Sequence, residues 1–325
     1  MPIISYVFSR LGQACLTLIV VSIVVFLLLR VFPGSPIDYY ISINPFATEE
    51  FIEEMERKMG LDKPLQHQYL TWLNQIIRGD FGDSLSRPGQ PVGGLLRTRV
   101  FNSLLLSLVA NAISFAVGVP IGMITAIKRY TIIDDIARVG SLLAYSVPSF
   151  CLGLVLIYIF SVYLGLLPSS GMRSIVHIYT NSFREILDVL RHMILPAITL
   201  GTIGAAFTAR LTRSSMLEVV NEDYVRTARA KGLKESGVVW KHMLKNALGP
   251  VITVTGLQIG FLFGSAAVTE TVFAWPGVGR EVVMAAFQRD YPVIIAITII
   301  VSLLFIFVNL VTDISYAFLD PRVRL

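Results

Sequence analysis

Six long apolar stretches, separated by polar segments, dominate the pattern of hydrophobic and polar positions along this 325-residue chain. A helix needs about 20 residues to cross the hydrocarbon core of a membrane, and each stretch approaches or exceeds that length. The apolar residues run continuously and do not alternate with polar ones, which favours helices over the strands of a barrel. The predicted spans are Leu11–Val31, Val100–Ile127, Val139–Gly165, Ile194–Arg210, Pro250–Thr269 and Tyr291–Ile314.

The composition agrees with a polytopic membrane protein, since 54% of the residues are hydrophobic and 15% are charged. The first stretch is predicted to be an uncleaved anchor. It is longer than the apolar region of a signal peptide, and Phe32-Pro33-Gly34 follows it where a cleavage site would need small residues. Cys15 and Cys151 fall inside spans without metal-ligand spacing, so we interpret them as packing residues.

Lysine and arginine are distributed unevenly between the two sides of the predicted membrane. With the N-terminus inside, the inner segment 210–245 carries eight of them, and the two short outer loops together carry five. The positive-inside rule therefore predicts that both termini are cytoplasmic. The net charge of +5 follows from this asymmetry and does not indicate a nucleic-acid partner.

The central part of every span lacks Asp, Glu, Lys and Arg, while Arg30, Glu270 and Asp313 lie near span ends. Proton-driven carriers use ionisable groups inside the membrane, so their absence argues against that class. A sodium-coupled carrier built on backbone carbonyls stays an alternative. The chain has no phosphate-binding loop, no H-E-x-x-H and no G-x-S-x-G, and its four histidines are scattered. We therefore expect no ATP hydrolysis, no intramembrane hydrolase activity, no metal site and no cofactor in this chain.

The chain divides into three predicted parts. Residues 1–31 hold the N-terminus and the first span, residues 32–99 form a polar outer segment, and residues 100–325 form a five-helix core. One amphipathic helix is predicted from Thr48 to Gly60, and a second from Pro64 to Gly79. Two interpretations are open. The segment is either a cap packed on the outer membrane face or a collar that receives a substrate-delivering protein.

The polar segment 211–249 lies between the fourth and fifth spans and is predicted to be cytoplasmic. Asn221 is predicted to cap a helix that has acidic residues in its first turn and basic residues toward its end, as the helix dipole favours. Gly232 is a natural stop for this helix. Small residues at Ala228, Ala230 and Gly232 would let another surface approach the backbone closely.

A second helix is predicted over Ser236–Leu248, and Pro250 is predicted to start the next span. The apolar stripe of this helix contains Val239, Trp240, Met243, Leu244, Ala247 and Leu248. A basic loop that only satisfies the positive-inside rule explains the charge but not the pair of helices. The alternative is a segment that takes up mechanical force from a soluble partner.

The stretch Glu222–Pro250 reads EDYVRTARAKGLKESGVVWKHMLKNALGP. It resembles the cytoplasmic loop of permease subunits in binding-protein-dependent ABC importers, and in particular the dipeptide, oligopeptide, glutathione and nickel group. Two departures stand out. Arg226-Thr227-Ala228 replaces the Glu-Ala-Ala of the general motif, and Leu244-Lys245 replaces its closing Leu-Pro.

Shorter motifs resemble the same family in the same order along nearly the whole chain. They are Phe32-Pro33-Gly34-Ser35-Pro36, Gly60-Leu61-Asp62-Lys63-Pro64-Leu65, Gly79-Asp80-Phe81-Gly82, Pro91-Val92, Leu167-Pro168, Leu195-Pro196, the FAWPGVGR run from Phe273 to Arg280, Asp290-Tyr291-Pro292-Val293 and Leu319-Asp320-Pro321-Arg322. The resemblance implies an all-α polytopic membrane protein with six transmembrane helices, the type I ABC importer permease fold and an outer helical insertion.

The resemblance also implies a function and partners. The chain would be a non-catalytic permease subunit in a bacterial inner membrane, taking up peptides or related solutes such as glutathione, opines or nickel complexes. Its partners would be a second related permease, two ATPase subunits that bind ATP and Mg, and an extracytoplasmic solute-binding protein. The expected ATPase contacts are Asp223, Tyr224, Thr227, Ala228, Ala230, Lys231, Gly232 and Leu233. The expected binding-protein or outer-vestibule residues are Trp72, Phe273, Trp275, Pro276 and Arg280.

Overall fold

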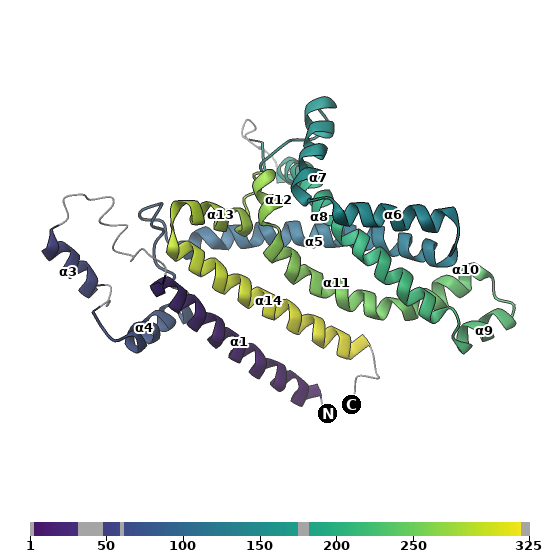
Figure 1. Ribbon diagram of the computed structural model, residues 1–325, viewed down its shortest axis with the longest axis horizontal. Coiled ribbons are helices and arrows are strands. Elements are labelled where there is room, and N and C mark those ends of the chain that lie inside the picture. The colour runs from purple at the N-terminus through teal and green to yellow at the C-terminus, as the bar shows by residue number, and fades with distance from the viewer. Residues whose placement is uncertain (1–2, 32–47, 59–61, 175–181, 320–325) are drawn as a thin grey trace.

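The computed structural model describes residues 3–31, 48–58, 62–174 and 182–319, which form an elongated array of helices (Figure 1). In that part of the chain the only β-type pairing is an isolated bridge between Asp83 and Pro91. The helices are α1 Ile3–Val31, α3 Glu49–Lys58, α4 Leu65–Ile77, α5 Val92–Ile127, α6 Ile132–Ser146, α7 Ser149–Leu156, η1 Ile157–Tyr163, α8 Ser182–Val219, α9 Asp223–Ala230, α10 Glu235–Gly237, η2 Val238–Leu244, α11 Lys245–Ser265, α12 Ala267–Val272, α13 Val278–Gln288 and α14 Tyr291–Leu319, with η1 and η2 being π-helices.

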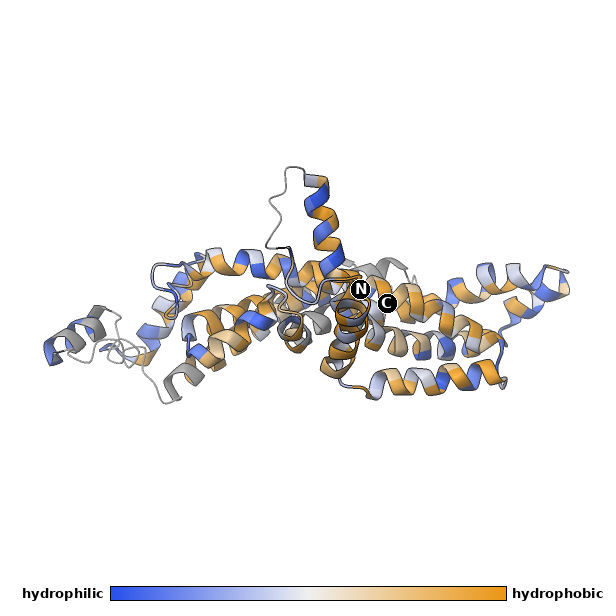
Figure 2. Cartoon of the chain, turned by 90° about the horizontal axis from the view of Figure 1, so that it is seen from above, coloured by the Kyte–Doolittle hydropathy of each residue, from blue (hydrophilic) through white to orange (hydrophobic). Residues whose placement is uncertain are grey.

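All six predicted spans lie on helices. Four single helices (α1, α5, α8 and α14) contain stretches long and apolar enough to cross a membrane, and the bent pair of α6 with α7 and η1 makes a fifth if its two halves count as one span. The predicted fifth span covers most of α11, a helix of 21 residues, but its predicted end is wrong, because α11 ends at Ser265 and the last residues of the prediction belong to α12. Figure 2 shows hydrophobic residues along the long helices and hydrophilic residues gathered toward the two ends of the molecule.

Two other predicted span boundaries are corrected by the structure. The third span is not one straight helix, because α6 ends before Pro148 and the chain turns by 100° into α7 and η1. Val147 adopts an extended conformation, which is what the ring of a following proline favours. Pro250 does not start the fifth span, since it lies inside α11.

Other predictions fall partly outside the described residues. The turn at Phe32–Pro36, the helix stop at Gly60 and the motif residues Asp320–Arg322 lie there. The two predicted outer helices correspond to α3 and α4.

The centre of the fold is the close pair of α5 and α8. Gly118 and Gly122 of α5 face Thr208 and Thr212 of α8 so closely that a methyl group at either glycine would collide with the α8 backbone. Small residues of this kind let membrane helices pack by van der Waals contact, since the hydrophobic effect supplies no attraction between helices in lipid.

The other helices are arranged around this pair. α6 packs on α8, α11 packs on both α8 and α5, α14 packs on α11, and α1 lies beside α14. In Figure 1, α9 and α10 lie at one end of the molecule, and α3 and α4 lie at the other. The first residues of α1 and the last residues of α14 both point toward the end where α9 lies.

Candidate functional site

The helix α9 stands at the end of the molecule, in the loop between α8 and α11 (Figure 1). Glu222 occupies its N-cap position in extended conformation, without a side-chain capping bond, so the predicted cap at Asn221 is wrong by one residue. The predicted stop at Gly232 is confirmed. Its φ of 73° is left-handed, and its N–H donates to the carbonyl of Arg229 at 2.9 Å.

One face of α9 packs against the rest of the chain. Val225 and Ala228 are buried on this face. They join an apolar cluster whose other buried members are Val119, Met123, Ala126, Met216, Val238, Val239, Met243, Leu244, Ala247 and Val251. The small side chain of Ala228 therefore accommodates neighbouring helices of this chain and is not presented to a partner. The cluster joins α9 firmly to α5, α8, η2 and α11.

The opposite face of α9 and the turn after it are exposed. The exposed members of the predicted contact set are Asp223, Tyr224, Thr227, Ala230, Lys231, Gly232 and Leu233. Tyr224 is 39% exposed and Leu233 is 47% exposed, which places apolar surface among the charges.

Trp240 adds to this apolar surface. It is 60% exposed, so the prediction that it packs on the apolar stripe of its helix is wrong. The reason is that residues 238–244 form a π-helix, with bonds from residue i to i+5 instead of i+4. This wider turn buries Val238 and Val239 together with Met243 and Leu244, and it leaves Trp240 outside.

Charged side chains around α9 form two ion pairs. Arg229 donates to Glu235 from Nη2 at 2.8 Å and from Nε at 3.3 Å, which ties the end of α9 to α10. Hydrogen bonds from Arg229 hold the pKa of Glu235 below its usual value. Arg226 approaches Asp223 at 3.6 Å, and both side chains are well exposed. Exposed pairs of this kind contribute about 0–1 kcal/mol each.

The turn between α12 and α13 is compact. Phe273 and Trp275 are buried, and the Trp275 indole donates from Nε1 to the carbonyl of Asn102 at 3.1 Å. The Asn102 amide donates in return to the carbonyl of Pro276 at 2.9 Å. The Trp275 side chain holds the turn against α5, and the Phe273 ring lies beside Gly153 of α7. Neither side chain presents a surface to another protein, whereas Pro276 and Arg280 are partly exposed.

Glu270 lies beneath the same turn and is fully buried. Its carboxylate accepts from Ser103 Oγ at 2.5 Å and from the backbone N–H of Arg280 at 2.9 Å. The Ser103 hydroxyl oxygen accepts from the N–H of Val278 at 2.8 Å, and the Arg280 guanidinium donates to the carbonyl of Ala274 at 2.8 Å. Since every one of these groups has a partner, Glu270 fixes the turn in place.

Trp72 lies on α4, which packs against the first span. Its ring centroid is 5.6 Å from that of Phe26 on α1. Tyr69 on the same helix is 5.4 Å from Phe26 and shares a hydrogen bond of 2.8 Å with Ser22 Oγ. The structure therefore packs α4 against the first span, and the cap and the collar both stay predictions.

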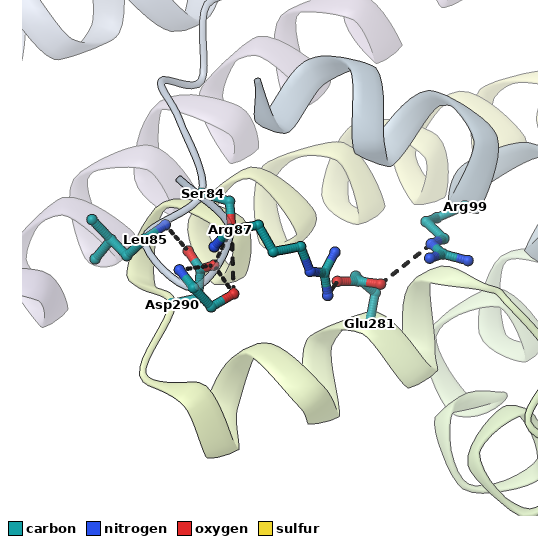
Figure 3. Close-up of polar contacts among 7 residues, drawn as sticks. Ser84, Leu85, Arg87, Arg99, Glu281 and Asp290 are labelled. Atoms are coloured by element: carbon teal, nitrogen blue, oxygen red, sulfur yellow. Dashed lines mark hydrogen bonds and ion pairs between the residues drawn. The ribbon is translucent and has the colours of Figure 1, made fainter. Parts of the chain in front are cut away.

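A polar cluster that sequence reasoning missed joins the outer segment to the start of α14 (Figure 3). Asp290 accepts hydrogen bonds from Ser84 Oγ at 2.5 Å, Leu85 N at 3.1 Å, Ser86 N at 3.0 Å and Ser86 Oγ at 2.7 Å. We call these four residues the Asp290 clasp. Burial would raise the pKa of Asp290, but the hydrogen bonds from Ser84 and Ser86 outweigh it and hold the pKa below its usual value.

A second carboxylate reinforces this clasp. Glu281 of α13 pairs with Arg87 at 2.6 Å and with Arg99 of α5 at 3.2 Å, and its side chain is 7% exposed. The residues of the clasp lie far apart in sequence. Asp80-Phe81-Gly82, which precedes Ser84, and Asp290-Tyr291-Pro292, which contains Asp290, both belong to the motifs noted above. Among the described residues, no group of His, Cys, Asp and Glu could hold a metal ion.

With four helices long and apolar enough to cross a membrane, a fifth such stretch if the bent pair counts as one span, and an exposed helix at one end, the chain has the architecture of the membrane subunit of a transporter. It belongs to the family described as binding-protein-dependent transport system inner membrane component, whose model matches residues 118–325. A second model, for the N-terminal part of binding-protein-dependent transport system membrane components, matches residues 3–96.

Relatives match the chain from end to end. The oligopeptide transport system permease protein AppB of Bacillus subtilis (strain 168) is 41% identical over 320 residues, which covers 98% of this chain and 99% of AppB. The glutathione transport system permease protein GsiC of Escherichia coli (strain K12) is 41% identical over 322 residues, 99% of each chain. The di/tripeptide transport system permease protein DppB of Pseudomonas aeruginosa (strain UCBPP-PA14) is 42% identical over 335 residues, again 99% of each.

A solved structure supports the fold. The chain matches the inward-facing MetNI methionine ABC transporter (CY5 native crystal form) with a TM-score of 0.53 and 20% identity, over 70% of this chain and 96% of the matched one. The predicted type I ABC importer permease fold is therefore confirmed, and the chain is a permease subunit of this class.

Proposed function

We propose that this chain is one permease subunit of an ATP-driven importer that carries peptides or related small solutes into a bacterial cell. The names of the relatives support this solute class: AppB is an oligopeptide permease, DppB a di/tripeptide permease and GsiC a glutathione permease. Opines and nickel complexes belong to the same proposed range. The chain carries no catalytic site of its own, and the energy comes from ATP and Mg bound by partner subunits.

One observation carries the coupling role: α9 is exposed on one face and joined on the other to the helices that cross the membrane. Its exposed face offers Tyr224 and Leu233 to a partner. Its buried face belongs to an apolar cluster shared with α5, α8 and α11. Protein interiors are close-packed and transmit strain, so a displacement of α9 would move those three helices together.

The proposed assembly contains a second related permease, two ATPase subunits and an extracytoplasmic solute-binding protein. The α9 end would face the cytoplasm, where the ATPases are, and both termini would lie on that side, as the lysine and arginine distribution predicts. α3, α4 and the Asp290 clasp would then face outward, toward the solute-binding protein. Of the expected outer contacts, Trp72, Pro276 and Arg280 are the partly exposed ones.

Transport would proceed by alternating access between the two permeases. ATP-dependent approach of the ATPases would displace α9 in both copies, opening one end of the path as the other closes. Nothing in the comparisons favours the ion-coupled carrier that remained as an alternative. Within the described spans, the ionisable side chains lie at the helix ends and not at the centres, where an ion relay would need them.

The exposed apolar residues of α9 provide the test. Tyr224→Ala combined with Leu233→Ala should strip the ATPase subunits from the purified complex. A hot-spot side chain typically contributes about 2 kcal/mol or more, which exceeds a tenfold change in affinity. Phe287→Ala is the matched control, because Phe287 is 82% exposed on α13 at the other end of the molecule. Retention of the ATPases in the double variant, at the level of the control, would refute the docking role of α9.

The turn after α9 gives a second test that leaves the contact side chains intact. Gly232 has a φ of 73°, so Gly232→Val should cost about 1–2 kcal/mol locally and reduce ATP-driven uptake. Gly237→Val is the control, since Gly237 lies in helical conformation with open space around it. Normal uptake and normal ATP hydrolysis in Gly232→Val would contradict a mechanical role for this turn.

A further inference from the structure

A cavity of about 450 Å³ lies between α5, α6 and α8, toward the α9 end of these helices. Its polar lining consists of Thr125, Arg138, Ser141, Arg210, Arg213 and Ser214. Three arginines around one cavity would repel one another unless anions compensate their charge. The first question is therefore how many of these arginines already have a carboxylate partner.

The positive charge of Arg213 is fully compensated by a carboxylate. Its Nε and Nη2 donate to the two oxygens of Asp134, both at 2.9 Å, in a planar bidentate pair. Asp134 is completely buried and also accepts from the N–H of Tyr130 at 3.2 Å. This pair joins the start of α6 to α8 and fixes the inner wall of the cavity.

The positive charge of Arg138 is compensated by carboxylates at the rim of the cavity. It forms an ion pair with Asp135 and lies 3.7 Å from Asp134, and its side chain is 55% exposed. Asp135 is equally exposed, so water screens this pair and a second anion can share the guanidinium.

Arg210 is the arginine that lacks a carboxylate, since it forms no ion pair with any described residue. Its guanidinium lies 5.6 Å from the centroid of the Tyr145 ring, a cation–π contact that orients the group without neutralising it. Lys128 and Arg129, which follow α5 directly, add positive charge at the same end of the helices. The cavity thus has a net excess of positive charge, with donors that suit phosphate oxygens.

The rest of the lining is apolar. Ile121, Leu142 and Leu217 contribute to it, one from each of the three helices. Leu142, one of these lining residues, is 59% exposed. A free anion would leave this apolar surface uncovered. A ligand with a phosphate and acyl chains would satisfy the arginines and cover the apolar rim at the same time.

We infer that this cavity binds the phosphate headgroup of an anionic phospholipid such as phosphatidylglycerol, with Arg210 as the principal donor and Arg138 and the serine hydroxyls assisting. Basic pockets between membrane helices on the cytoplasmic side recognise anionic headgroups by this combination of charge and apolar wall. The bound lipid would strengthen the contact of α6 with α8. The inference does not depend on what solute is carried or on how α9 is engaged.

The test measures lipid affinity directly. The full-length chain, purified in detergent with its associated subunits, is titrated with phosphatidylglycerol, phosphatidylcholine and inorganic phosphate while the midpoint of thermal unfolding is followed. Phosphatidylglycerol should raise the midpoint, and the zwitterionic lipid and free phosphate should not. Arg210→Gln should weaken the apparent affinity by about tenfold or more, because a hydrogen bond to a charged group is lost. Arg210→Lys should retain part of it.

Arg129→Gln is the matched control, since it removes the same charge at the same end of the helices but outside the cavity. It should change the affinity by less than about twofold, as expected for an exposed surface charge. Ser141→Leu fills the cavity without removing a charge and should also abolish binding, which keeps the test decisive if Arg210→Gln folds poorly.

Four results would overturn the inference. Equal stabilisation by phosphatidylcholine would show that no headgroup is recognised. Saturation by free phosphate would assign the site to a soluble anion, and protection by a tripeptide with a free carboxylate in place of the lipid would assign it to transported solute. An equal loss in Arg210→Gln and Arg129→Gln would reduce the effect to general surface charge.

Discussion

Replacing Asp290 by asparagine tests how firmly the outer segment is held to the start of α14. The carboxylate accepts four hydrogen bonds in the Asp290 clasp and is 1% exposed, so solvent does not screen them. Asparagine keeps one acceptor oxygen and turns an NH₂ group toward donors that already point at it. Oδ2 accepts three of the four bonds and Oδ1 accepts only the one from Leu85 N, so asparagine loses at least one bond, and the remaining bonds no longer go to a charged group. Hydrogen bonds to charged groups contribute about 1.5–3 kcal/mol each, against about 0.5–1.5 kcal/mol for neutral ones, which sets the cost near 3 kcal/mol or above.

This cost can be read from limited proteolysis of the purified complex. If segment 80–91 opens and closes faster than the protease cuts it, the cleavage rate is proportional to the fraction of molecules in which the segment is open. A destabilisation of about 3 kcal/mol then corresponds to roughly a hundredfold faster cleavage. Asp83→Asn is the control, because Asp83 lies in the same segment with an exposed side chain. A double-mutant cycle with Ser86→Ala should show a coupling of about 1 kcal/mol or more. Equal cleavage of Asp290→Asn and Asp83→Asn would refute the reasoning.

The pH dependence of the stability of the Asp290 clasp follows from the direction of the pKa shift of Asp290. The pKa of Asp290 is lower in the folded protein than in the unfolded chain, where an aspartate titrates near about 3.9. The stabilisation is therefore fully present above the unfolded value and is lost only as the pH falls through the lower, folded value. Between about pH 7.5 and 5, proteolytic protection of segment 80–91 should stay constant. A loss of protection near pH 6 would show that another group controls the segment.

Two further predictions concern packing. Gly122→Ala should destabilise the α5–α8 pair by about 1–3 kcal/mol, because the new methyl would lie 2.4 Å from the carbonyl oxygen of Ala209; Gly140→Ala, with open space around it, should leave the unfolding midpoint unchanged. Trp275→Ala should cost about 3–5 kcal/mol, because the side chain is fully buried. Basal and binding-protein-stimulated ATP hydrolysis should therefore fall together, whereas selective loss of stimulation would mean that Trp275 contacts the partner directly.

The sequence predicts the membrane helices well because the signal is local. Each span is a continuous apolar run, and no other regular structure places such a run in lipid with its backbone bonds satisfied. Gly232 was found for the same reason, since a helix that ends in left-handed conformation favours glycine at that position. The break at Pro148 was also visible as a proline between two apolar stretches, but length alone suggested a single span.

What the sequence does not predict depends on contacts between distant residues. Ser84 and Asp290 are separated by 206 positions, and nothing local in either motif indicates the other. From the sequence, Trp275 suits a membrane-interface anchor or a contact residue, and only the packed turn shows that it is buried in the core. Trp240 was assigned to the wrong face because the π-helix changes the periodicity on which the assignment rests.

The positions of the charged contacts along the helices suggest which parts of this chain can move relative to one another. The ionic and carboxylate contacts described above hold the two ends of the helix array, with Asp134 and Arg213 at one end and Glu270, Glu281 and Asp290 at the other. Between them, α5 and α8 touch through glycines, where even one added methyl group has no room. A core packed this tightly does not deform continuously. We infer that α5 and α8 move together where Gly118 and Gly122 contact Thr208 and Thr212.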